Sequence, residues 1–502
     1  MSGGGEPVVV ALDQGTTSTR AIAFDASGRP VAQASRPLEQ IYPQAGWVEH
    51  DPRQIADHSL AVLGEVLAAC APAPAVALGI TNQRETVVLW ERGSGRPLHN
   101  AIVWQDRRTS PACEAIRAGG HEALITARTG LLADPYFSAT KIAWLLDHIP
   151  GARKRAEAGE LAAGTVDSWL IWTLTGGRVH ACDETNASRT LLFDIGAGRW
   201  DEELLALFDV PAAILPQVRP CRGSFGRCEA GLLGQELEIL GVAGDQQAAA
   251  FGQGCFGAGA TKATFGTGCF VLANCGAAQI ASANRLLTTI ADAGEGKRQY
   301  ALEGSIFMAG AVVQWLRDSL GLIGSAVETE ALAAAADPAS GVFLVPAFQG
   351  LGAPWWDADA RGLICGLSRA AGKAEIVRAA LEGVAFQTRD LIDALGADMV
   401  RLGLDPLTSL RVDGGMAAND WFAQCLADTV GLPVERAALA ETTALGAAYH
   451  AGLAAGVWDS KEDLAQMARA ATTFEPRMGA DERGQRYGGW RRAVERTRER
   501  AG

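Results

Sequence analysis

Short apolar runs separated by glycine-containing turns recur along this chain and give the first indication of its fold. Residues 8–12 and 21–25 are compact apolar runs, and the polar stretch between them contains Gly15. Two such runs around a glycine predict a β-hairpin, with Gly15 at its tightest point. Residues 262–273 repeat the pattern of strand, glycine turn and strand, with a threonine in the turn. We interpret this second hairpin as a structural echo of the first, not as a sequence repeat.

Segments with helical periodicity lie between these runs. Asp51 followed by Pro52 predicts a helix start, because aspartate is a favoured N-cap and proline a favoured first helical residue. Further helices are predicted over 376–395, 419–429 and 443–455, and further strands over 75–81, 87–90 and 410–415. Strands alternate with helices throughout, which predicts an α/β fold in two lobes. We expect the lobes to be residues 1–250 and 251–502, with the glycine-rich stretch 251–260 as a candidate hinge.

Composition narrows the classes of function. The 502 residues are 48% hydrophobic and 20% charged, as in globular proteins, and the net charge of −13 argues against a nucleic-acid or anionic-membrane surface. The ten cysteines form no C-x-x-C pair and are typical of a reducing compartment. The N-terminus lacks a signal peptide, and no window approaches the roughly 18–20 apolar residues of a membrane span. We therefore expect a cytoplasmic protein without an integral membrane segment.

The stretch L-D-Q-G-T-T-S-T-R at 12–20 is a candidate phosphate site, although it has no lysine. Backbone N–H groups of a tight turn and the hydroxyls that follow can bind an anion, and Arg20 adds a charged donor. Asp13 would repel phosphate but can hold Mg²⁺ through water. The alternative is a hydroxyl-capped hairpin with Asp13 and Arg20 as a surface pair.

Two later strand ends carry similar turns, F-G-T-G at 265–268 and V-D-G-G-M-A-A-N at 412–419. Open α/β sheets bind ligands at strand ends. Three turns from opposite halves of the chain that meet in one cleft would clamp a nucleotide, which is the architecture of actin-like ATPases and sugar kinases.

Motifs between these turns carry a resemblance to a known family. They are Q-I-Y-P-Q-A-G-W-V-E-H-D-P (40–52), G-I-T-N-Q-R-E-T (79–86), V-W-Q-D-R-R-T (103–109), D-P-Y-F-S-A-T-K (134–141), T-V-D-S-W-L-I-W (165–172), T-N-A-S-R-T (185–190), A-G-D-Q-Q-A-A (243–249) and F-G-T-G-C-F (265–270). Together they closely resemble the glycerol kinases of the FGGY carbohydrate kinase family, nearly from end to end. The resemblance implies two lobes, each built on a ribonuclease-H-like mixed sheet flanked by helices, with ATP, Mg²⁺ and glycerol in the cleft between them.

The resemblance also implies roles for individual residues. The phosphates would be lined by Thr16, Thr17 and Ser18, with Arg20 beside them, and by Thr267 from the second lobe. Further nucleotide contacts would be Gly310, Gln314, Gly415 and Asn419. The glycerol site would consist of Arg84, Glu85, Trp104, Tyr136, Asp245, Gln246 and Phe270. Beyond the resemblance, our hypothesis on mechanism makes Asp245 the general base. It places Asp13, through water, and Asp245 on the Mg²⁺ side.

The chemistry of these side chains agrees with the implied roles. Arginine only donates hydrogen bonds and carboxylates only accept them, so Arg84, Glu85 and Asp245 together can orient hydroxyl groups. Each also has a plainer explanation: Arg84 and Glu85 as a solvated pair, Asp245 as a helix cap, and Trp104 and Phe270 as core. Without the resemblance, we would favour the core assignment for the two aromatic residues.

One segment departs from the family pattern. Some bacterial glycerol kinases bind fructose 1,6-bisphosphate in a glycine- and arginine-rich loop before the G-D-Q-Q motif, whereas residues 229–240 here are acidic and lack arginine. We therefore predict no such inhibition through this loop. The alternative substrates are another polyol or a sugar such as a pentulose. Outside metabolism the same fold serves ATP-driven chaperones and filament proteins, but no polypeptide-binding or polymerising surface is evident. We expect a homodimer or homotetramer.

Overall fold

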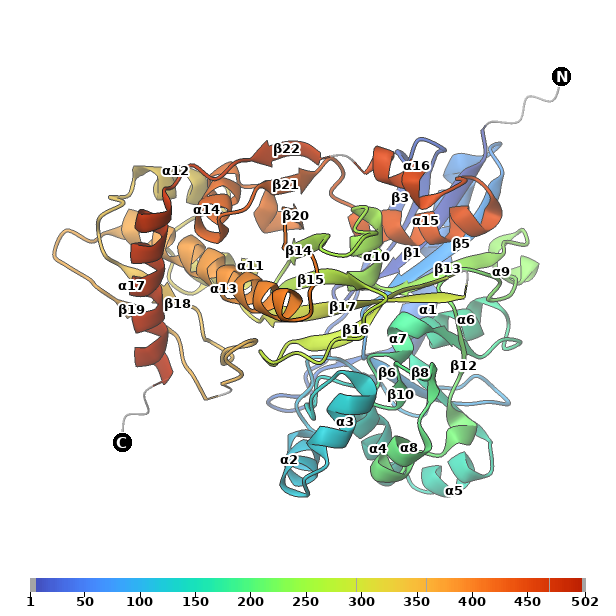
Figure 1. The fold of residues 1–502 in the computed structure, drawn as a ribbon. Helices are drawn as coiled ribbons and strands as arrows, with labels where there is room; N and C mark the ends of the chain where they lie inside the picture. The colour runs from blue at the N-terminus through green and yellow to red at the C-terminus, as the bar shows by residue number, and fades with distance from the viewer. Residues whose placement is uncertain (1–5, 295, 358, 469, 499–502) are drawn as a thin grey trace.

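The computed structural model describes residues 6–294, 296–357, 359–468 and 470–498, which form two lobes joined side by side (Figure 1). The two largest clusters of buried apolar residues lie one in each lobe, so each sheet has its own core. No helix in these ranges is long and apolar enough to cross a membrane. The fold is α/β with mixed sheets, as predicted.

The first lobe is built on a five-stranded sheet of order β13-β5-β1-β2-β3. Its strands are β1 (Val8–Gln14), β2 (Ser18–Phe24), β3 (Pro30–Pro37), β5 (Ala75–Asn82) and β13 (Ile239–Gly244). β1, β2 and β3 pair antiparallel in sequence, and β5 lies parallel to both β1 and β13. The predicted first hairpin is therefore confirmed as β1–β2.

The second lobe is built on a seven-stranded sheet of order β16-β17-β15-β14-β20-β21-β22. Its strands are β14 (Thr261–Phe265), β15 (Cys269–Gly276), β16 (Leu287–Gly294), β17 (Lys297–Ile306), β20 (Leu410–Asp413), β21 (Val434–Ala437) and β22 (Ala470–Phe474). The inner five strands repeat the pairing of the first sheet, with two antiparallel pairs followed by two parallel ones. The structural echo predicted from residues 262–273 is thus confirmed at the level of topology.

Helices cover both faces of the first sheet. On one face lie α1 (Pro52–Cys70), which begins at the predicted Asp51 cap, and α6 (Val166–Leu174). On the other lie α10 (Asp245–Gly252) and α15 (Thr442–Ala455). α15 packs so closely that a Cβ on Gly79 of β5 would come within 2.1 Å of the Ala447 carbonyl oxygen. Glycine is therefore required where this helix crosses the sheet.

The chain crosses between the lobes three times. It leaves the first lobe after α10, returns at α15, and leaves again after α16 (Lys461–Met467), which packs into the same apolar cluster as α15. Figure 1 shows α15 and α16 beside β1, β3 and β5. The predicted division at residue 250 stays a prediction. By packing, α15 lies on the first sheet although it belongs to the second half of the sequence.

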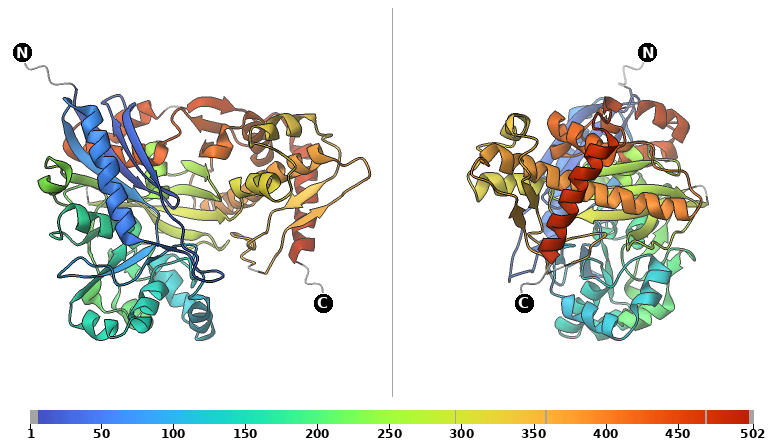
Figure 2. Two further views of the ribbon diagram at one scale, coloured as in Figure 1. Left: turned by 180° about the vertical axis from the view of Figure 1, so that it is seen from behind. Right: turned by 60° about the vertical axis from the view of Figure 1, so that its left-hand side comes forward.

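The remaining elements complete the two lobes (Figure 2). The first lobe adds a small sheet of β4 (Glu49–His50), β7 (Ala101–Ile102), β6 (Val87–Glu91) and β8 (Leu161–Thr165). It also has α2 (Ser110–Ala118), α3 (Glu122–Thr129), α4 (Ala139–His148), α5 (Ala152–Glu157), β9 (Ala181–Asp183), α7 (Glu184–Ala187), β10 (Phe193–Asp194), β11 (Arg199–Trp200), α8 (Glu202–Phe208), η1 (Ala212–Ile214), β12 (Gln217–Arg219) and α9 (Ala230–Leu233). The second lobe adds α11 (Gly310–Asp318), α12 (Glu328–Ala335), β18 (Phe343–Val345), β19 (Leu363–Cys365), α13 (Lys373–Arg401), η2 (Gly415–Ala418), α14 (Asp420–Val430) and α17 (Ala480–Arg498). The predicted helix over 376–395 is thus the middle of the longer α13.

Candidate active site

The turn between β1 and β2 presents unused hydroxyl groups. It is closed by a hydrogen bond from the Gly15 N–H to the Ser18 carbonyl oxygen (3.0 Å). Thr16 accepts a hydrogen bond from the Trp104 indole through its Oγ1 (3.0 Å). The hydroxyls of Thr17 and Ser18 have no partner among the described residues, and both side chains are at least partly exposed. The turn is therefore held by its backbone while its hydroxyls stay free for a ligand.

Asp13 and Arg20 face each other across the β1–β2 pair but do not form the surface ion pair considered as an alternative. The Arg20 guanidinium instead donates to the carboxylate of Glu441, just before α15. Burial raises the pKa of Asp13 to about 7; the Arg20 charge opposes this rise, and the negative charges of Asp245 and Glu441 add to it. Asp13 thus lies in an acidic environment that a cation would stabilise.

The turn between β14 and β15 packs against the start of α11. The carbonyl oxygen of Thr267 accepts from the backbone N–H groups of Ala309 (2.9 Å) and Ala311 (3.1 Å), and a Cβ on Gly310 would lie 2.6 Å from the Gly266 carbonyl oxygen. Gly310 is therefore needed for this close approach. Gln314 lies one turn further along α11 and is exposed.

The turn after β20 meets the turn after β14. Gly414 has a φ of 89°, and a Cβ there would lie 2.4 Å from the Phe265 carbonyl oxygen. Asn419 uses its side chain inside the fold: its Oδ1 caps α14 by accepting from the Phe422 N–H (2.9 Å), and its Nδ2 donates to Thr329 Oγ1 (3.1 Å). Gly415 faces open space.

The start of α15 links the first turn to the third. Glu441 pairs with Arg20 of β2, and the next residue, Thr442, donates through its hydroxyl to Asp413 at the end of β20. The three glycine turns predicted from the sequence therefore approach one another, and two consecutive residues of one helix start connect them.

Arg84 is the centre of a buried charged cluster. Its guanidinium donates to both carboxylate oxygens of Glu303 (2.6 and 3.1 Å), and Glu303 also accepts from Arg189 (2.8 Å). Arg189 in turn donates to Glu85 (2.7 Å). Arg84 and Glu85 are each only 1% exposed at the side chain, so the alternative of a solvated pair is wrong.

Opposite charges determine the protonation of this cluster. Burial alone would raise the pKa of Glu303, but the charges of Arg189 and Arg84 outweigh it and lower that pKa to about 2. For Glu85, burial dominates over the same arginine charges, and the pKa is raised. Glu85 also has a φ of 61°, in the left-handed region that is unusual for a residue with a Cβ. Such strain concentrates at functional sites.

Asp245 lies at the open edge of the cluster, as the first residue of α10. Its Oδ1 is 3.2 Å from Arg84 Nε, and 29% of its side chain is exposed. Burial raises the pKa of Asp245, while the positive charges of Arg84 and Lys262 act against that rise. Its carboxylate accepts from the Gln246 N–H (2.7 Å). The alternative assignment of Asp245 as a helix cap holds only for this hydrogen bond to Gln246, because the N-cap residue of α10 is Gly244.

Aromatic rings form one wall beside this cluster. Trp104 lies edge-on to Tyr136, with ring centroids 5.7 Å apart, and to Phe270, at 6.1 Å. The Arg84 guanidinium lies 5.9 Å from the Phe270 centroid and donates weakly to the Tyr136 hydroxyl (3.4 Å). Trp104 and Phe270 are only partly buried, so neither is an ordinary core residue. All seven predicted glycerol-site residues therefore gather in one place.

Sequence reasoning missed three buried residues that hold this site. Glu303 lies on β17 of the second lobe, and Arg189 lies in the motif T-N-A-S-R-T, from which no role was predicted for it. Lys262 of β14 is fully buried and donates to the side chains of Gln246 and, at 2.9 Å, of Thr264. A lone charge inside an apolar strand was the available signal in each strand, at Glu303 in Y-A-L-E-G-S-I and at Lys262 in T-K-A-T-F.

Comparisons with known proteins agree over the whole chain. Residues 8–252 match the N-terminal domain, and residues 261–455 the C-terminal domain, of the FGGY family of carbohydrate kinases. The chain is 56% identical over 493 residues to the glycerol kinase of Alcanivorax borkumensis, covering 98% of both, and 57% identical to that of Rhodospirillum rubrum, covering 98% of this chain and 99% of the relative.

Solved structures give the same result. The crystal structure of Plasmodium falciparum glycerol kinase with ADP superposes with a TM-score of 0.93 at 37% identity, over 100% of both chains. A xylulose kinase from Rhodospirillum rubrum superposes with a TM-score of 0.83 at 26% identity, over 97% of this chain and 98% of the other. On this evidence, the chain belongs to the FGGY family of carbohydrate kinases.

Proposed function

We propose that this protein phosphorylates glycerol with ATP, giving sn-glycerol 3-phosphate and ADP. The observation that carries the proposal is the small site around Arg84, where a buried charged cluster faces an aromatic wall and one partly exposed carboxylate, Asp245. Relatives named glycerol kinase, at 54–57% identity over nearly the full chain, support the choice of acceptor.

The site suits a molecule that is almost all hydroxyl. Arg84 can only donate hydrogen bonds and the ionised carboxylates can only accept them. A hydroxyl placed between Arg84 and Asp245 would therefore accept from Arg84 and donate to Asp245. The rings of Trp104 and Phe270 offer an apolar surface to the C–H groups of the acceptor. A site of this kind rejects analogues that lack a hydroxyl, because its polar groups would then stay unpaired.

Asp245 is our candidate for the general base. In the proposed step, a terminal hydroxyl of glycerol gives its proton to the Asp245 carboxylate while its oxygen bonds to the γ-phosphorus of ATP. The bond from that phosphorus to the bridging oxygen breaks, and ADP leaves with the electron pair. The raised pKa of Asp245 makes its carboxylate a better proton acceptor than an ordinary aspartate. General-base help of this kind is worth about 10²–10⁴-fold in rate.

The three glycine turns are our candidates for holding the phosphates. The free hydroxyls of Thr17 and Ser18 and the turn at Thr267 provide neutral donors, which bind an anion without a lysine. Positioning by such groups supplies most of the rate in phosphoryl transfer, because the transition state is loose. Gln314, Gly415 and Asn419 stay predicted nucleotide contacts.

The residues on this side of the site fit Mg²⁺. The Asp13 carboxylate has no hydrogen-bond partner among the described residues. Burial raises its pKa most, and the charges of Asp245 and Glu441 add to that rise, so a nearby cation would stabilise the ionised form. The described residues contain no cluster of three or more His, Cys, Asp or Glu that would bind a metal by themselves. Asp13, through water, and Asp245 would therefore hold the ion together with the phosphates. When bound, Mg²⁺ would neutralise phosphate charge.

A coupled assay of ADP formation tests the proposal. We expect activity with glycerol and little activity with xylulose or without an acceptor. The activity with dihydroxyacetone relative to glycerol measures how strongly the site requires each hydroxyl group. The Asp245→Asn variant should lose at least about 100-fold in kcat while keeping its fold. Asp390→Asn is the matched control, because Asp390 is also buried, with its pKa raised by burial to about 6, but is held by Trp355, Tyr487 and Trp490 in the second lobe. Near-normal turnover of Asp245→Asn would refute its role as base, and stronger activity on xylulose would refute the choice of glycerol.

We also infer a cytoplasmic location. All ten cysteines are free, which suits a reducing compartment. Assembly into a homodimer or homotetramer remains a prediction, to be measured by light scattering.

A further inference from the structure

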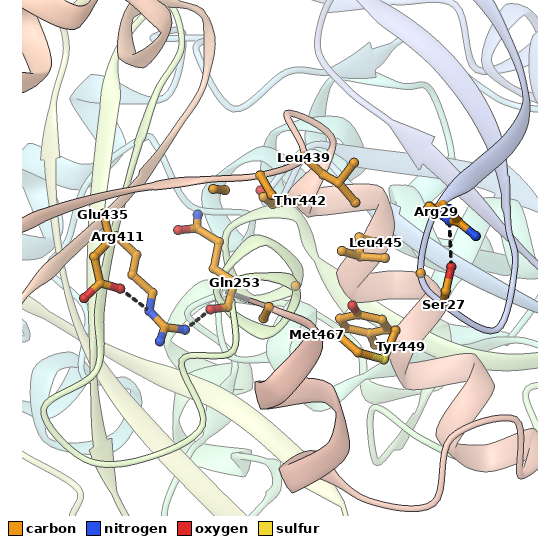
Figure 3. Close-up of a pocket in the computed structure, with 15 residues that line it drawn as sticks. Ser27, Arg29, Gln253, Arg411, Glu435, Leu439, Thr442, Leu445, Tyr449 and Met467 are labelled. Atoms are coloured by element: carbon orange, nitrogen blue, oxygen red, sulfur yellow. Dashed lines mark hydrogen bonds and ion pairs between the residues drawn. The ribbon is translucent and has the colours of Figure 1, made fainter. Parts of the chain in front are cut away.

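A cavity of about 230 Å³ lies where the chain crosses between the lobes (Figure 3). Gln253 lines it from the first crossing, just after α10. Leu439 and Thr442 line it from the second crossing, and Met467 lines it at the end of α16, where the third begins. None of the residues predicted for the glycerol or nucleotide sites lines this cavity. A molecule held here would contact all three crossing segments.

Two buried polar side chains in the cavity wall form no hydrogen bond to any residue that the structure describes. Gln253 is 3% exposed, and neither the oxygen nor the nitrogen of its amide is bonded to a described residue. Tyr449 of α15 is 1% exposed, and its hydroxyl likewise has no partner among the described residues. Unpaired buried polar groups are rare in folded proteins, because each loses its hydrogen bonds to water without replacement. The wall therefore carries one unpaired amide and one unpaired hydroxyl among the described residues.

The charged groups of the cavity are already paired. The Arg411 guanidinium donates to the Gln253 carbonyl oxygen and lies 3.3 Å from the Glu435 carboxylate. At the opposite end of the cavity, Arg29 donates to Ser27 Oγ (2.9 Å) and lies 3.6 Å from the Asp25 carboxylate. A charged ligand would have to break one of these pairs or remain unpaired itself, so the cavity favours an uncharged molecule.

The middle of the cavity is apolar. Figure 3 shows Leu445, Met467 and the Tyr449 ring between the polar end at Gln253 and the end at Ser27 and Arg29. Leu439 adds to this lining. A flat apolar body fits between such side chains, and a few polar groups at one end fix its orientation, as is usual for small-molecule sites.

We propose that this cavity binds a small uncharged ligand that carries an N–H donor next to an acceptor on a flat ring. A side-chain amide with both its groups free pairs with its own complement, in the way that glutamine pairs with the donor–acceptor edge of adenine. Primary or cyclic amides and amino-heterocycles share this chemistry. The Gln253 amide would pair with that edge, the Tyr449 hydroxyl would provide a further hydrogen bond, and the ring would lie among Leu439, Leu445 and Met467.

Calorimetric titration of the full-length protein tests this site. The probes are nicotinamide, as the amide, and adenine, as the amino-heterocycle; both are titrated with saturating ADP and glycerol present, so that the active site is filled. Nicotinate is the control ligand, because it has the same ring and size but is charged and lacks the N–H donor. We expect at least one of the two probes to bind and nicotinate not to bind.

Three variants locate the binding. Gln253→Met removes the amide at similar size, and Leu445→Trp fills the cavity; each should weaken probe binding at least about tenfold. Gln424→Met is the matched control, because Gln424 lies on α14 outside the cavity and its amide nitrogen donates to Asp428 and to the Glu475 carbonyl oxygen. It should leave probe binding unchanged. The unfolding midpoint of each variant shows whether it is folded at the assay temperature.

Binding of a probe that is lost in Gln253→Met and kept in Gln424→Met supports the proposal, and which probe binds identifies the ligand class. The absence of binding by both probes to the wild-type protein would overturn it. Unchanged binding in Gln253→Met, or equal binding of nicotinate, would overturn it as well. If Leu445→Trp does not fold, Tyr449→Phe, which removes one hydroxyl, takes its place and should weaken binding by at least about threefold.

Discussion

Replacement of Glu303 by glutamine should separate the structural role of the buried charged cluster from its role in binding glycerol. Glu303 is fully buried on β17 of the second lobe, and it binds Arg84 through two hydrogen bonds and Arg189 through one. The change removes one negative charge at nearly constant shape. It leaves two buried arginines with less counter-charge, which is the costly way to break a buried ion pair.

The magnitude follows from the pKa of Glu303, which falls from an ordinary value of 4.5 to about 2. At about 1.4 kcal/mol per pKa unit, this corresponds to about 3 kcal/mol of stability at neutral pH. Because the pKa is lowered, this stabilisation is fully present above pH 4.5 and is lost as the pH falls towards 2. We expect Glu303→Gln to lower the free energy of unfolding by about 3 kcal/mol at pH 7, measured by urea denaturation.

The same variant should raise the KM for glycerol at least about tenfold, because Arg84 loses the acceptor that fixes its guanidinium. It should also extend activity to lower pH. The charge of Glu303 raises the pKa of Asp245, so its removal keeps the base ionised further into acid. Steady-state kinetics across pH measure both effects.

Glu382→Gln is the matched control. Glu382 is buried on α13 and, like Glu303, binds two arginines, Arg378 (2.7 Å) and Arg486 (2.6 Å), but lies away from the cleft. Its replacement removes a buried acceptor of two arginines and should leave the KM for glycerol unchanged. A Glu303→Gln variant with a KM within twofold of wild type would refute the positioning of Arg84 by this residue. A loss of less than about 1 kcal/mol would refute the electrostatic reasoning.

The remaining predictions concern the phosphate side and regulation. Burial raises the pKa of Asp13 from 3.8 to about 7, so ionisation of Asp13 destabilises the ligand-free protein as the pH rises between these values. In urea denaturation, Asp13→Asn should therefore stabilise the protein by about 1–2 kcal/mol at pH 8 but not at pH 4. The turnover of this variant should fall at least about tenfold. Trp104→Phe removes the indole bond to Thr16 while keeping an aromatic ring in the wall, and should raise the KM for ATP about fivefold in the coupled assay. Fructose 1,6-bisphosphate should not inhibit through residues 229–240, because the adjacent Arg227 is already paired with two glutamates there; strong inhibition in a titration would contradict this.

Local structure could be predicted from the sequence because its causes are local. The β1–β2 hairpin follows from two apolar runs around Gly15, and the start of α1 follows from an Asp–Pro pair whose aspartate caps the helix as expected. The predicted strand at 87–90 exists as β6, but it pairs in the small sheet instead of beside β5. The sequence of an apolar run does not determine which strand it will pair with.

Contacts between residues far apart in the sequence could not be predicted, because local patterns do not specify distant partners. α15 packs on a sheet whose strands lie hundreds of residues earlier, and the only local trace is a helix rich in alanine and glycine. Glu303 and Arg84 are separated by 219 residues. The roles of Arg84 and Asp245 came from a resemblance to known kinases, which is information that the periodicity of the chain does not contain.

The placement of Glu303 makes the assembly of the site depend on contact between the lobes. Arg84 and Arg189 belong to the first lobe, and their shared acceptor comes from the second, so their ion pairs with Glu303 form only when the lobes meet. Neighbouring bonds reinforce this contact: the Thr288 N–H donates to the Gly130 carbonyl oxygen (2.8 Å), and Gln247 donates to the Ile290 carbonyl oxygen (3.0 Å). Any relative movement of the lobes must either break these bonds or turn about them. Because breaking them would strand buried charges, the favourable movement is one that keeps the glycerol side closed and changes the separation at the glycine turns.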